Sequence, residues 1–299
     1  MDGRSPIRAD TRVLVALVQT IGMATTEELV RATNQLDMSL STEELDAHRE
    51  HITDFIAAQY EAAGADRVVM GLSGGIDSTL TSHLAVEAVG AENVHALVMP
   101  SEVNRESNMS DAERVASELL DVEYDVVEIT PIADAFLDAF PDADEDRMAT
   151  GNLYVRIRAV LNYLVANTEG GLVVGTGNRT EALVGYFTKY GDGAVDCHPI
   201  ANLYKQQVRQ LARHVGVPDD LAGKEASAGM WVDQTDEGEL GMDYDTLDSI
   251  LALHVDGPLS VSATADHIGV DAETIERVRG LYEGSEHKRA APPGPEPLY

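Results

Sequence analysis

Residues 70–79 hold the residue types best suited to phosphate chemistry in this chain: paired glycines, hydroxyl side chains and one carboxylate. The turn Ser73–Gly75 lies between an apolar run, Arg67–Met70, and a run of helical periodicity that Gly90 ends, so it joins a buried strand to a helix. Adjacent glycines let backbone N–H groups face a ligand, and a helix N-terminus adds partial positive charge. The pattern predicts an anion cradle suited to phosphate. It is not a Walker loop, because the terminal Gly-Lys-Ser/Thr is missing; the alternative is a simple glycine-rich turn.

Two carboxylates follow strands in the same way. Asp77 comes directly after the cradle, where a carboxylate beside phosphate calls for an intervening divalent cation. Glu181 ends a second turn, Gly175–Glu181, which also follows an apolar run and opens a helix. If the two carboxylates meet above the sheet, they and phosphate oxygens would form a magnesium site. The alternative for Glu181 is a first-turn glutamate that complements the helix dipole.

Strand-like and helix-like runs alternate through most of the chain, which predicts an α/β fold with a doubly wound parallel sheet and flanking helices. Ligands of such sheets bind at the carboxyl ends of the strands, where both Ser73 and Thr176 fall. Strands are predicted at 67–70, 94–99, 124–129 and 172–175, and helices at 80–89, 110–120, 131–140 and 148–166. In the last helix the residues with core spacing are Tyr154, Ile157, Leu161 and Leu164.

The two ends of the chain fall outside this alternation. We predict a helical N-terminal extension over residues 1–40, with short helices at Thr11–Ile21 and Thr26–Leu36. An amphipathic helix from Thr42 to about Ala63 follows, and Gly64 ends it. The main domain would cover 41–289, and residues 290–299 form a Pro-rich tail without periodicity.

Composition excludes several classes of partner. The 299 residues include 52 acidic and 21 basic ones, a formal net charge of −31, which argues against nucleic acid or an anionic membrane as partner. An acidic surface with few lysines is typical of halophilic proteins from a high-salt cytoplasm; the alternative is an acidic mesophilic protein. No apolar run reaches the roughly 18 residues of a membrane span. No signal-type apolar core follows the N-terminus, so we expect a cytoplasmic protein.

The lysines and the one cysteine are informative because they are so few. A chain this poor in lysine should retain it where a compact, mobile ammonium is needed. The four lysines are Lys189, Lys205, Lys224 and Lys288. A single cysteine, Cys197, excludes an internal disulfide and a cysteine-based zinc site. We do not expect it to act as a nucleophile with His198, because adjacent residues on an extended segment point apart.

Seven motifs in one order resemble ammonia-dependent NAD synthetase, a family of the ATP pyrophosphatase, or adenine nucleotide alpha hydrolase-like, superfamily. In this sequence they are Ser73–Ser78, Gly151–Arg158, Gly175–Glu181, Thr188–Gly193, Asn202–Arg209, Gln234–Glu237 and His287–Arg289. The resemblance covers about residues 43–293, so it implies that 41–289 is an NAD synthetase catalytic domain.

The resemblance implies a ligase that forms a carbon–nitrogen bond. Such an enzyme converts nicotinate adenine dinucleotide (deamido-NAD) to NAD with ATP, magnesium and ammonia. The nicotinate carboxylate attacks the α-phosphate of ATP, pyrophosphate leaves, and ammonia displaces AMP from the acyl adenylate. The negative carboxylate and the negative phosphate repel each other, so cations must neutralise part of this charge before the two can react. The resemblance also implies a homodimer, and ammonia rather than glutamine, because we see no room for an amidohydrolase domain.

Residue roles carry over by motif position. ATP would be bound by Gly71, Leu72, Ser73, Gly74, Gly75, Ile76, Asp77, Ser78, Thr176, Lys205 and Ser227. The dinucleotide would be bound by Arg156, Lys189, Asp196, His287 and Lys288. Asp77 and Glu181 would hold magnesium, and together with Lys189 they are the catalytic candidates. Lys224, just before the Ser227 segment, is a further candidate ligand.

Three other functions remain open. Another pyrophosphatase-loop enzyme, amidating a nucleotide or thiolating tRNA, would share the first loop but not Thr188–Asp196 or His287–Arg289. A DNA-binding regulator is suggested by the helix-turn-helix rhythm of Leu259–Tyr282, but acidic residues outnumber basic ones there, which favours a packed helical hairpin. A non-catalytic nucleotide-binding module would leave the second carboxylate, Glu181, without a role.

Overall fold

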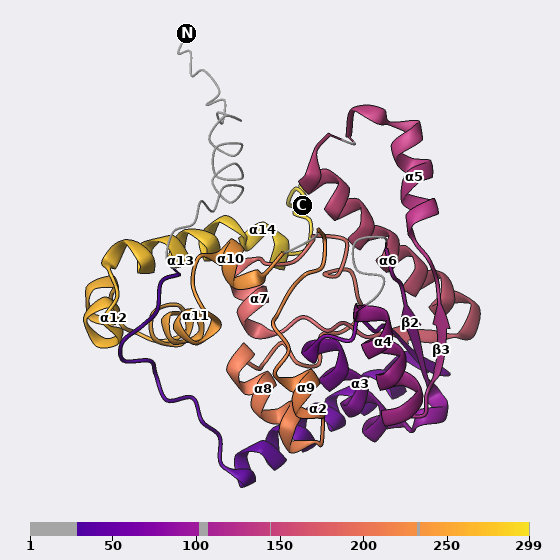
Figure 1. Cartoon of the computed structure of the whole chain (residues 1–299), viewed down its shortest axis with the longest axis horizontal. Helices are drawn as coiled ribbons and strands as arrows, with labels where there is room; N and C mark the ends of the chain where they lie inside the picture. The colour runs from indigo at the N-terminus through magenta and orange to yellow at the C-terminus, as the bar shows by residue number, and fades with distance from the viewer. Residues whose placement is uncertain (1–28, 102–106, 144, 232–233, 299) are drawn as a thin grey trace.

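The centre of the molecule is a four-stranded parallel sheet. A computed structural model describes residues 29–101, 107–143, 145–231 and 234–298. The strand order is β3-β2-β1-β4. The strands are β1 (Arg67–Gly71), β2 (Val94–Val98), β3 (Glu123–Val126) and β4 (Gly171–Val173). β1 pairs in parallel with β2 and β4, and β2 with β3, so all carboxyl ends meet at one edge (Figure 1).

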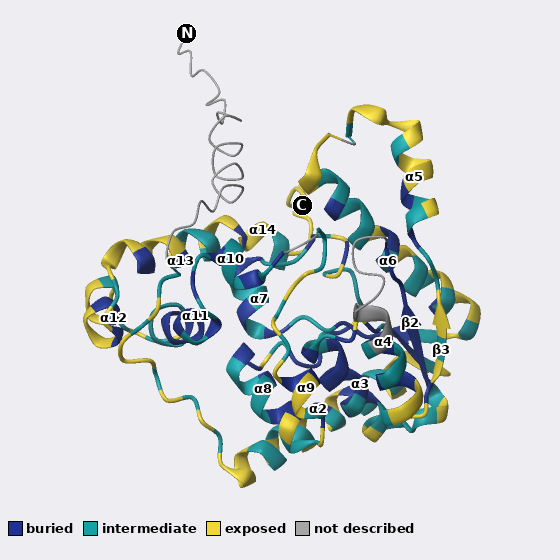
Figure 2. Cartoon of the chain, viewed as in Figure 1, coloured by how far each residue is buried: buried dark blue, intermediate teal, exposed yellow. Residues whose placement is uncertain are grey.

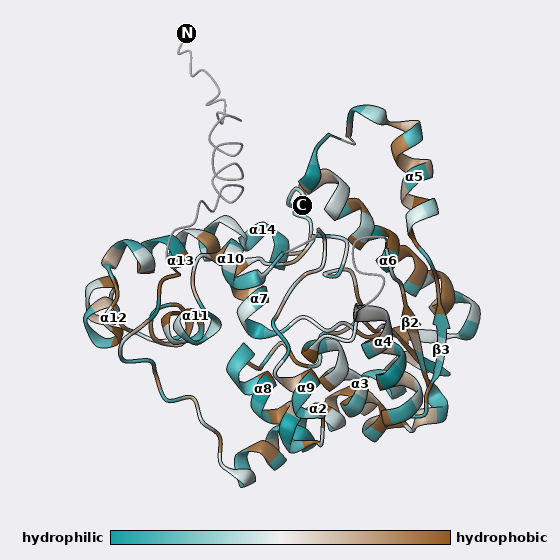
Figure 3. Cartoon of the chain, viewed as in Figure 1, coloured by the Kyte–Doolittle hydropathy of each residue, from teal (hydrophilic) through white to brown (hydrophobic). Residues whose placement is uncertain are grey.

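Helices cover both faces of this sheet, because side chains of β1 alternate between two cores. Val68 and Met70 belong to a core shared with α2 (Thr42–Ala63), α3 (Ile76–Val89) and α8 (Lys205–His214). Val69 belongs to a second core, on the face covered by α5 (Thr130–Ala139) and α6 (Arg147–Glu169). Figure 3 shows β2 brown, that is hydrophobic, between the helices, whereas much of β3, at the edge of the sheet, is hydrophilic. The predicted doubly wound parallel sheet is confirmed.

Most other helices lie close to where the sequence predicts them. Those around the sheet are α4 (Ser107–Arg114) with a π-helical turn (Val115–Leu119), α5 (Thr130–Ala139), α6 (Arg147–Glu169), α7 (Arg179–Val184) and α9 (Asp219–Ala222). Short 3-10 turns cover Ala91–Asn93 and Pro141–Ala143. The predicted starts and stops hold: Ser41 and Glu44 form a capping box on α2, and Gly64 ends that helix with φ 59°.

A separate helical core packs beside the sheet domain. Its elements are α10 (Asp236–Leu240), α11 (Tyr244–Ile250) with a π-helical turn (Leu251–Val255), α12 (Val261–Ile268), α13 (Ala272–Gly284) and α14 (Glu286–Arg289). Leu247, Ile268 and Ile275 are fully buried in it. Figure 2 shows much of α11 buried and turns of α12 and α13 exposed. The segment with helix-turn-helix rhythm is therefore a hairpin packed on the molecule.

Two predictions fail in the structure. The predicted helix Thr11–Ile21 lies outside the described residues, but residues 29–36 of the predicted helix Thr26–Leu36 are extended, not helical. Their N–H groups find acceptors on distant helices instead: Ala32 donates to Thr246 Oγ1 at 2.7 Å, and Leu36 to Ser249 Oγ at 3.1 Å. These bonds replace the internal bonds of a helix.

The second failure concerns α6. Leu164 has core spacing, yet its side chain is 57% exposed, and Val160, one turn earlier, is 67% exposed. Ile157, on the other side of the helix, is buried as predicted. α6 therefore carries two apolar surfaces, of which only one faces the sheet.

Candidate active site

The predicted phosphate loop joins β1 to α3 at the carboxyl edge of the sheet. It is held from within: Ser78 Oγ accepts the N–H of Ser73 at 3.2 Å, and Ser73 Oγ accepts the N–H of Gly75 at 3.2 Å. Gly74 has φ 75°, a conformation that a glycine adopts without strain. Gly75 caps α3 and has no side chain to occupy the first N–H groups of the helix. The loop therefore presents a preformed helix N-terminus to an anion.

Asp77 and Glu181 are brought together, as the sequence predicts, and one lysine joins them. Lys205 Nζ lies 2.6 Å from Asp77 Oδ2 and 3.1 Å from Glu181 Oε1. Its side chain is 2% exposed. Asn178 donates to the other oxygen of Asp77 at 2.8 Å and accepts the N–H of Glu181 at 2.9 Å, which caps α7. Residues from α3, α7 and α8 thus converge on a single cation position.

The position of Lys205 is fixed by a buried carboxylate that sequence reasoning missed. Asp248, on α11, accepts from Thr180 Oγ1 at 2.5 Å and from the N–H of Gln206 at 2.9 Å. Thr180 Oγ1 in turn accepts the N–H of Lys205 at 3.0 Å. Burial raises the pKa of Asp248 to about 6, although these hydrogen bonds oppose the rise. The one signal in the sequence is that Asp248 lies inside an apolar period of its helix.

Electrostatics couples the three charged groups. Burial raises the pKa of Glu181 to about 8; the positive charge of Lys205 opposes the rise, and Asp77 adds to it. Burial alone would lower the pKa of Lys205, but the two carboxylates outweigh it and raise this pKa, so the ammonium stays charged. Within the described residues no group of three or more metal-ligating side chains exists. Two carboxylates at one cation position fit a magnesium ion whose other ligands are phosphate and water.

Ser227 lies in a segment that is hydrogen-bonded to Gln234 and Asp236, close to the Lys205 position. Ser227 Oγ donates to Gln234 O at 2.6 Å, and the next N–H, of Ala228, donates to Asp236 Oδ1 at 2.9 Å. Tyr244, which also donates to Asp236, is buried with its ring centroid 5.0 Å from Lys205 Nζ. Asp236 belongs to the Gln234–Glu237 motif, but neither the motifs nor the spacing of the residues predicts a role in the site for Asp236 or for Tyr244.

The remaining predicted ATP residues divide into two groups. Thr176 follows β4 at the same carboxyl edge as the phosphate loop. Lys224 instead forms an ion pair with Asp111 of α4, with 2.7 Å between Nζ and Oδ2. The structure therefore gives Lys224 an internal partner and brings Thr176 to the predicted edge.

Three cations predicted to bind the dinucleotide lie together, and we call Arg156, Lys189 and Lys288 the cationic cluster. They come from α6, the Thr188–Gly193 loop and α14, and each donates to backbone carbonyls. Arg156 Nη2 lies 3.3 Å from Lys189 O, Lys189 Nζ donates to His287 O, and Lys288 Nζ lies 2.7 Å from Gly185 O. Asp196 is held elsewhere: it accepts the N–H of Val173 at 2.8 Å, beside β4.

The family model for NAD synthase matches residues 48–292. The chain belongs to the NAD synthase family. An NH(3)-dependent NAD(+) synthetase from Halobacterium salinarum is 58% identical over 260 residues, which are 87% of this chain and 97% of that protein. The family resemblance predicted from the sequence motifs is thereby confirmed, and the source of this relative agrees with the halophilic composition.

Solved structures are similar along nearly their whole length. The NMN synthetase from Francisella tularensis has a TM-score of 0.74 and 33% identity, and the match covers 86% of this chain and 99% of that one. The NH3-dependent NAD synthetase from Campylobacter jejuni, in complex with the nitrate ion, has a TM-score of 0.71 and 30% identity over 84% of this chain and 99% of that one. In the part of this chain that the structure describes, no helix is long and apolar enough to cross a membrane.

Proposed function

We propose that this NAD synthase amidates nicotinate adenine dinucleotide to NAD, with ammonia as nitrogen donor and ATP as co-substrate. The observation that carries the proposal is the cation position shared by Asp77, Glu181 and Lys205 beside a free helix N-terminus. Such a site binds a metal–triphosphate. The cationic cluster, to which α6 contributes Arg156, supplies positive charge for a second anionic substrate.

The first step joins the two substrates. A carboxylate oxygen of the nicotinate ring forms a bond to the α-phosphorus of ATP, the bond from that phosphorus to the bridging oxygen breaks, and pyrophosphate leaves with the electron pair. The N-terminal N–H groups of α3 and the Lys205 ammonium stabilise the charge on the departing phosphates. Thr176 and Ser227, at the carboxyl edge and in the Asp236-bound segment, hold the rest of ATP.

The second step forms the amide. The lone pair of ammonia attacks the acyl carbon of the adenylate, the carbon–oxygen bond to phosphate breaks, and AMP leaves with the electron pair. The attacking nitrogen loses one proton to water, which gives the neutral carboxamide. The reaction needs no covalent bond to the protein, and burial raises the pKa of the one cysteine thiol, Cys197, to about 11. The match to 97% of an NH(3)-dependent relative supports ammonia as the donor.

Magnesium fits this site on the chemistry of its donors. Asp77 and Glu181 would hold the ion, and phosphate oxygens and water would complete its shell. The ion would supply charge neutralisation as the carboxylate approaches the α-phosphate. Lys205 now occupies the position between the two carboxylates, so it must shift toward the phosphates when a metal enters.

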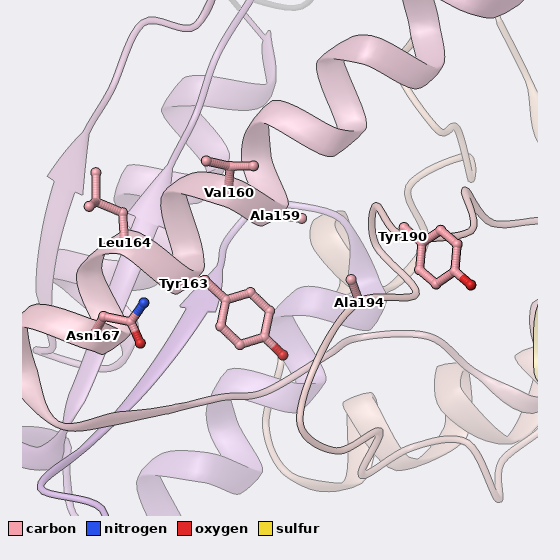
Figure 4. A pocket seen from close by; sticks show the side chains of 7 residues that line it. All are labelled: Ala159, Val160, Tyr163, Leu164, Asn167, Tyr190 and Ala194. Atoms are coloured by element: carbon pink, nitrogen blue, oxygen red, sulfur yellow. The ribbon is translucent and has the colours of Figure 1, made fainter. Parts of the chain in front are cut away.

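We further propose a homodimer formed through the exposed apolar surface of α6. A groove there is lined by Ala159, Val160, Tyr163, Leu164, Asn167, Tyr190 and Ala194 (Figure 4). Tyr190 belongs to the same loop as Lys189 of the cationic cluster, so this surface adjoins the dinucleotide side of the site. Exposed apolar patches mark interaction surfaces, and closed two-fold dimers are the commonest soluble assembly. A second copy of this chain is the occupant we propose.

The direct test is NAD formation by the purified protein with ATP, magnesium, ammonium and nicotinate adenine dinucleotide. We expect one AMP and one pyrophosphate for each NAD. No NAD under molar salt, where the acidic chain should be folded, would refute the proposal.

A second candidate is suggested by the similarity to the Francisella NMN synthetase: amidation of nicotinate mononucleotide to NMN. Comparing kcat/KM for the two nicotinate nucleotides separates these functions, and the 58% identity of the Halobacterium relative leads us to expect a preference for the dinucleotide.

A further inference from the structure

Arg158, the last residue of the Gly151–Arg158 motif, is a half-buried cation to which the steps above give no role. It lies on α6, and its Nε donates to the carbonyl of Met99 at 3.2 Å, just past the end of β2. The rest of its guanidinium makes no hydrogen bond or ion pair with any residue the structure describes. Burial lowers the pKa of Arg158 to about 10, while the charges of Asp192 and Tyr154 oppose this.

Arg158 has no carboxylate of the described residues within ion-pair distance, although the chain has 52 acidic residues and 21 basic ones. In the same part of the chain Arg156 and Arg289 also donate to carbonyls rather than to carboxylates. Arg114 and Arg279 do form ion pairs, at 2.5 and 2.8 Å. A less exposed guanidinium gains more from such a pair, because water screens it less. Asp192 acts on Arg158 only from beyond ion-pair distance, and its Oδ1 accepts the N–H of Thr188.

The position of Arg158 along α6 places it between the two halves of the site. One turn earlier, Val155 packs against Gly191 of the loop that carries Lys189. One turn later, Asn162 lies against Gly71, the residue where the phosphate loop begins; a Cβ at Gly71 would be 3.6 Å from Asn162 Nδ2. The strip of α6 with Val155, Arg158 and Asn162 therefore runs from the dinucleotide side to the ATP side.

We propose that Arg158 is a further catalytic residue, whose unpaired Nη groups bind the carboxylate of the pyridine substrate as it approaches the α-phosphate. This inference rests on the proposed function. On the ATP side, positive charge is already supplied by Lys205 and the α3 N-terminus. The carboxylate has no cation of its own among the assigned residues. A planar guanidinium matches the two oxygens of a carboxylate and holds one lone pair toward phosphorus.

The proposal makes a prediction about ligand binding that needs no turnover. Deamido-NAD carries a carboxylate where NAD carries a neutral carboxamide, and the two are otherwise the same. A residue that binds the carboxylate should favour deamido-NAD over NAD. On the proposed function the cationic cluster binds the phosphates, which both ligands share, so its residues should not discriminate.

The experiment is calorimetric titration of each dinucleotide, without ATP, into the full-length protein at molar salt. For Arg158→Gln we expect the Kd of deamido-NAD to rise roughly 30-fold or more, as when one partner of a partly buried charge pair is lost, and the Kd of NAD to stay within about two-fold. Arg158→Lys should keep part of the preference. Arg156→Gln should weaken both ligands to a similar extent, and Arg279→Gln, a surface change, neither.

The outcomes distinguish this inference from the proposed function. Loss of the preference in Arg158→Gln, with an unchanged melting temperature, supports the assignment. An unchanged preference, or equal weakening of both ligands, overturns it while wild-type NAD formation still stands. If Arg158→Gln does not fold, the titrations of Arg158→Lys decide: a preference identical to that of the wild type overturns the assignment. No NAD formation by the wild type overturns the proposed function itself.

Discussion

The two halves of the site hold their positive charges in different ways. Beside the phosphate loop, Lys205 is buried between two carboxylates, whereas the cationic cluster at the Thr188–Gly193 loop donates to backbone carbonyls. A carboxylate neutralises its cation; a carbonyl fixes the cation but leaves its charge to act on a ligand. The first half is thus neutral enough to be buried before ATP arrives. The second maintains a positive field within a chain of net charge −31.

The largest effect should come from breaking the first half. In Asp77→Asn and Glu181→Gln, one carboxylate is lost and the other still pairs with Lys205, so the fold should persist. We expect kcat/KM for ATP to fall by roughly 10²- to 10³-fold, because charge at the transferring phosphate is no longer matched. Turnover should be measured across a magnesium titration, with Asp220→Asn, a surface variant, as control. Near wild-type rates in both variants would remove the metal assignment.

The second half should depend on a second copy of the chain. Leu164→Asp places a charge on the exposed apolar surface of α6, where it costs the monomer little stability. We expect sedimentation at molar salt to show a monomer, with turnover reduced about tenfold or more because desolvating a charge in a dimer core is costly. Leu298→Asp, in the exposed tail, is the matched control. A fully active monomer would show that the dinucleotide half of the site does not depend on a dimer, and would contradict this prediction.

This contrast also explains which parts of the molecule the sequence could predict. Asp77 and Glu181 each follow a strand of a parallel sheet, so topology alone brings them to one edge. Asp248 could not be predicted, because its partners, Thr180 and Gln206, come from other helices. Periodicity marked Leu164 as apolar, but it cannot distinguish a core surface from one that faces outward.

The helix predicted over residues 26–36 is absent from 29–36 for the same reason that Asp248 could not be predicted. The N–H groups of this segment bond to Thr246, Ser249 and Ile268, more than 200 positions along the chain. Helical propensity is a local signal, and distant acceptors override it. The carbonyl partners of the cationic cluster leave no mark in the sequence either, since every residue has a carbonyl.

Salt should affect the two halves unequally. Between 0.1 M and 1 M potassium chloride the Debye length shrinks from about 10 Å to about 3 Å, which screens exposed charges far more than buried pairs. We therefore expect KM for the dinucleotide to rise several-fold and KM for ATP to change less. In Lys189→Gln, KM for the dinucleotide should depend less on the salt concentration than in the wild type. If KM for both substrates changes with salt to the same extent, the contrast between the two halves is wrong.

The same salt series should stabilise the fold, because a net charge of −31 repels itself most at low ionic strength. The melting temperature is the measurement, and it should rise up to molar salt. A flat or falling melting temperature would contradict the high-salt reading of the composition, whatever the kinetic curves show.

The smallest effect is expected at Cys197, which lies in the segment that joins the two halves. Its carbonyl accepts the N–H of Gly175 at 2.9 Å, and its side chain is 8% exposed. Burial, with a contribution from Asp196, raises the pKa of the Cys197 thiol to about 11. At pH 8 about one thousandth of the thiol is then ionised, so alkylation should be slow and should accelerate as pH rises toward 11.

Cys197→Ala should leave the rate of ammonia-dependent NAD formation within about two-fold of the wild-type rate, and glutamine should not replace ammonia in either protein. Glutamine-dependent NAD formation that disappears in Cys197→Ala would instead place a nucleophile at this position and refute the ammonia-only proposal.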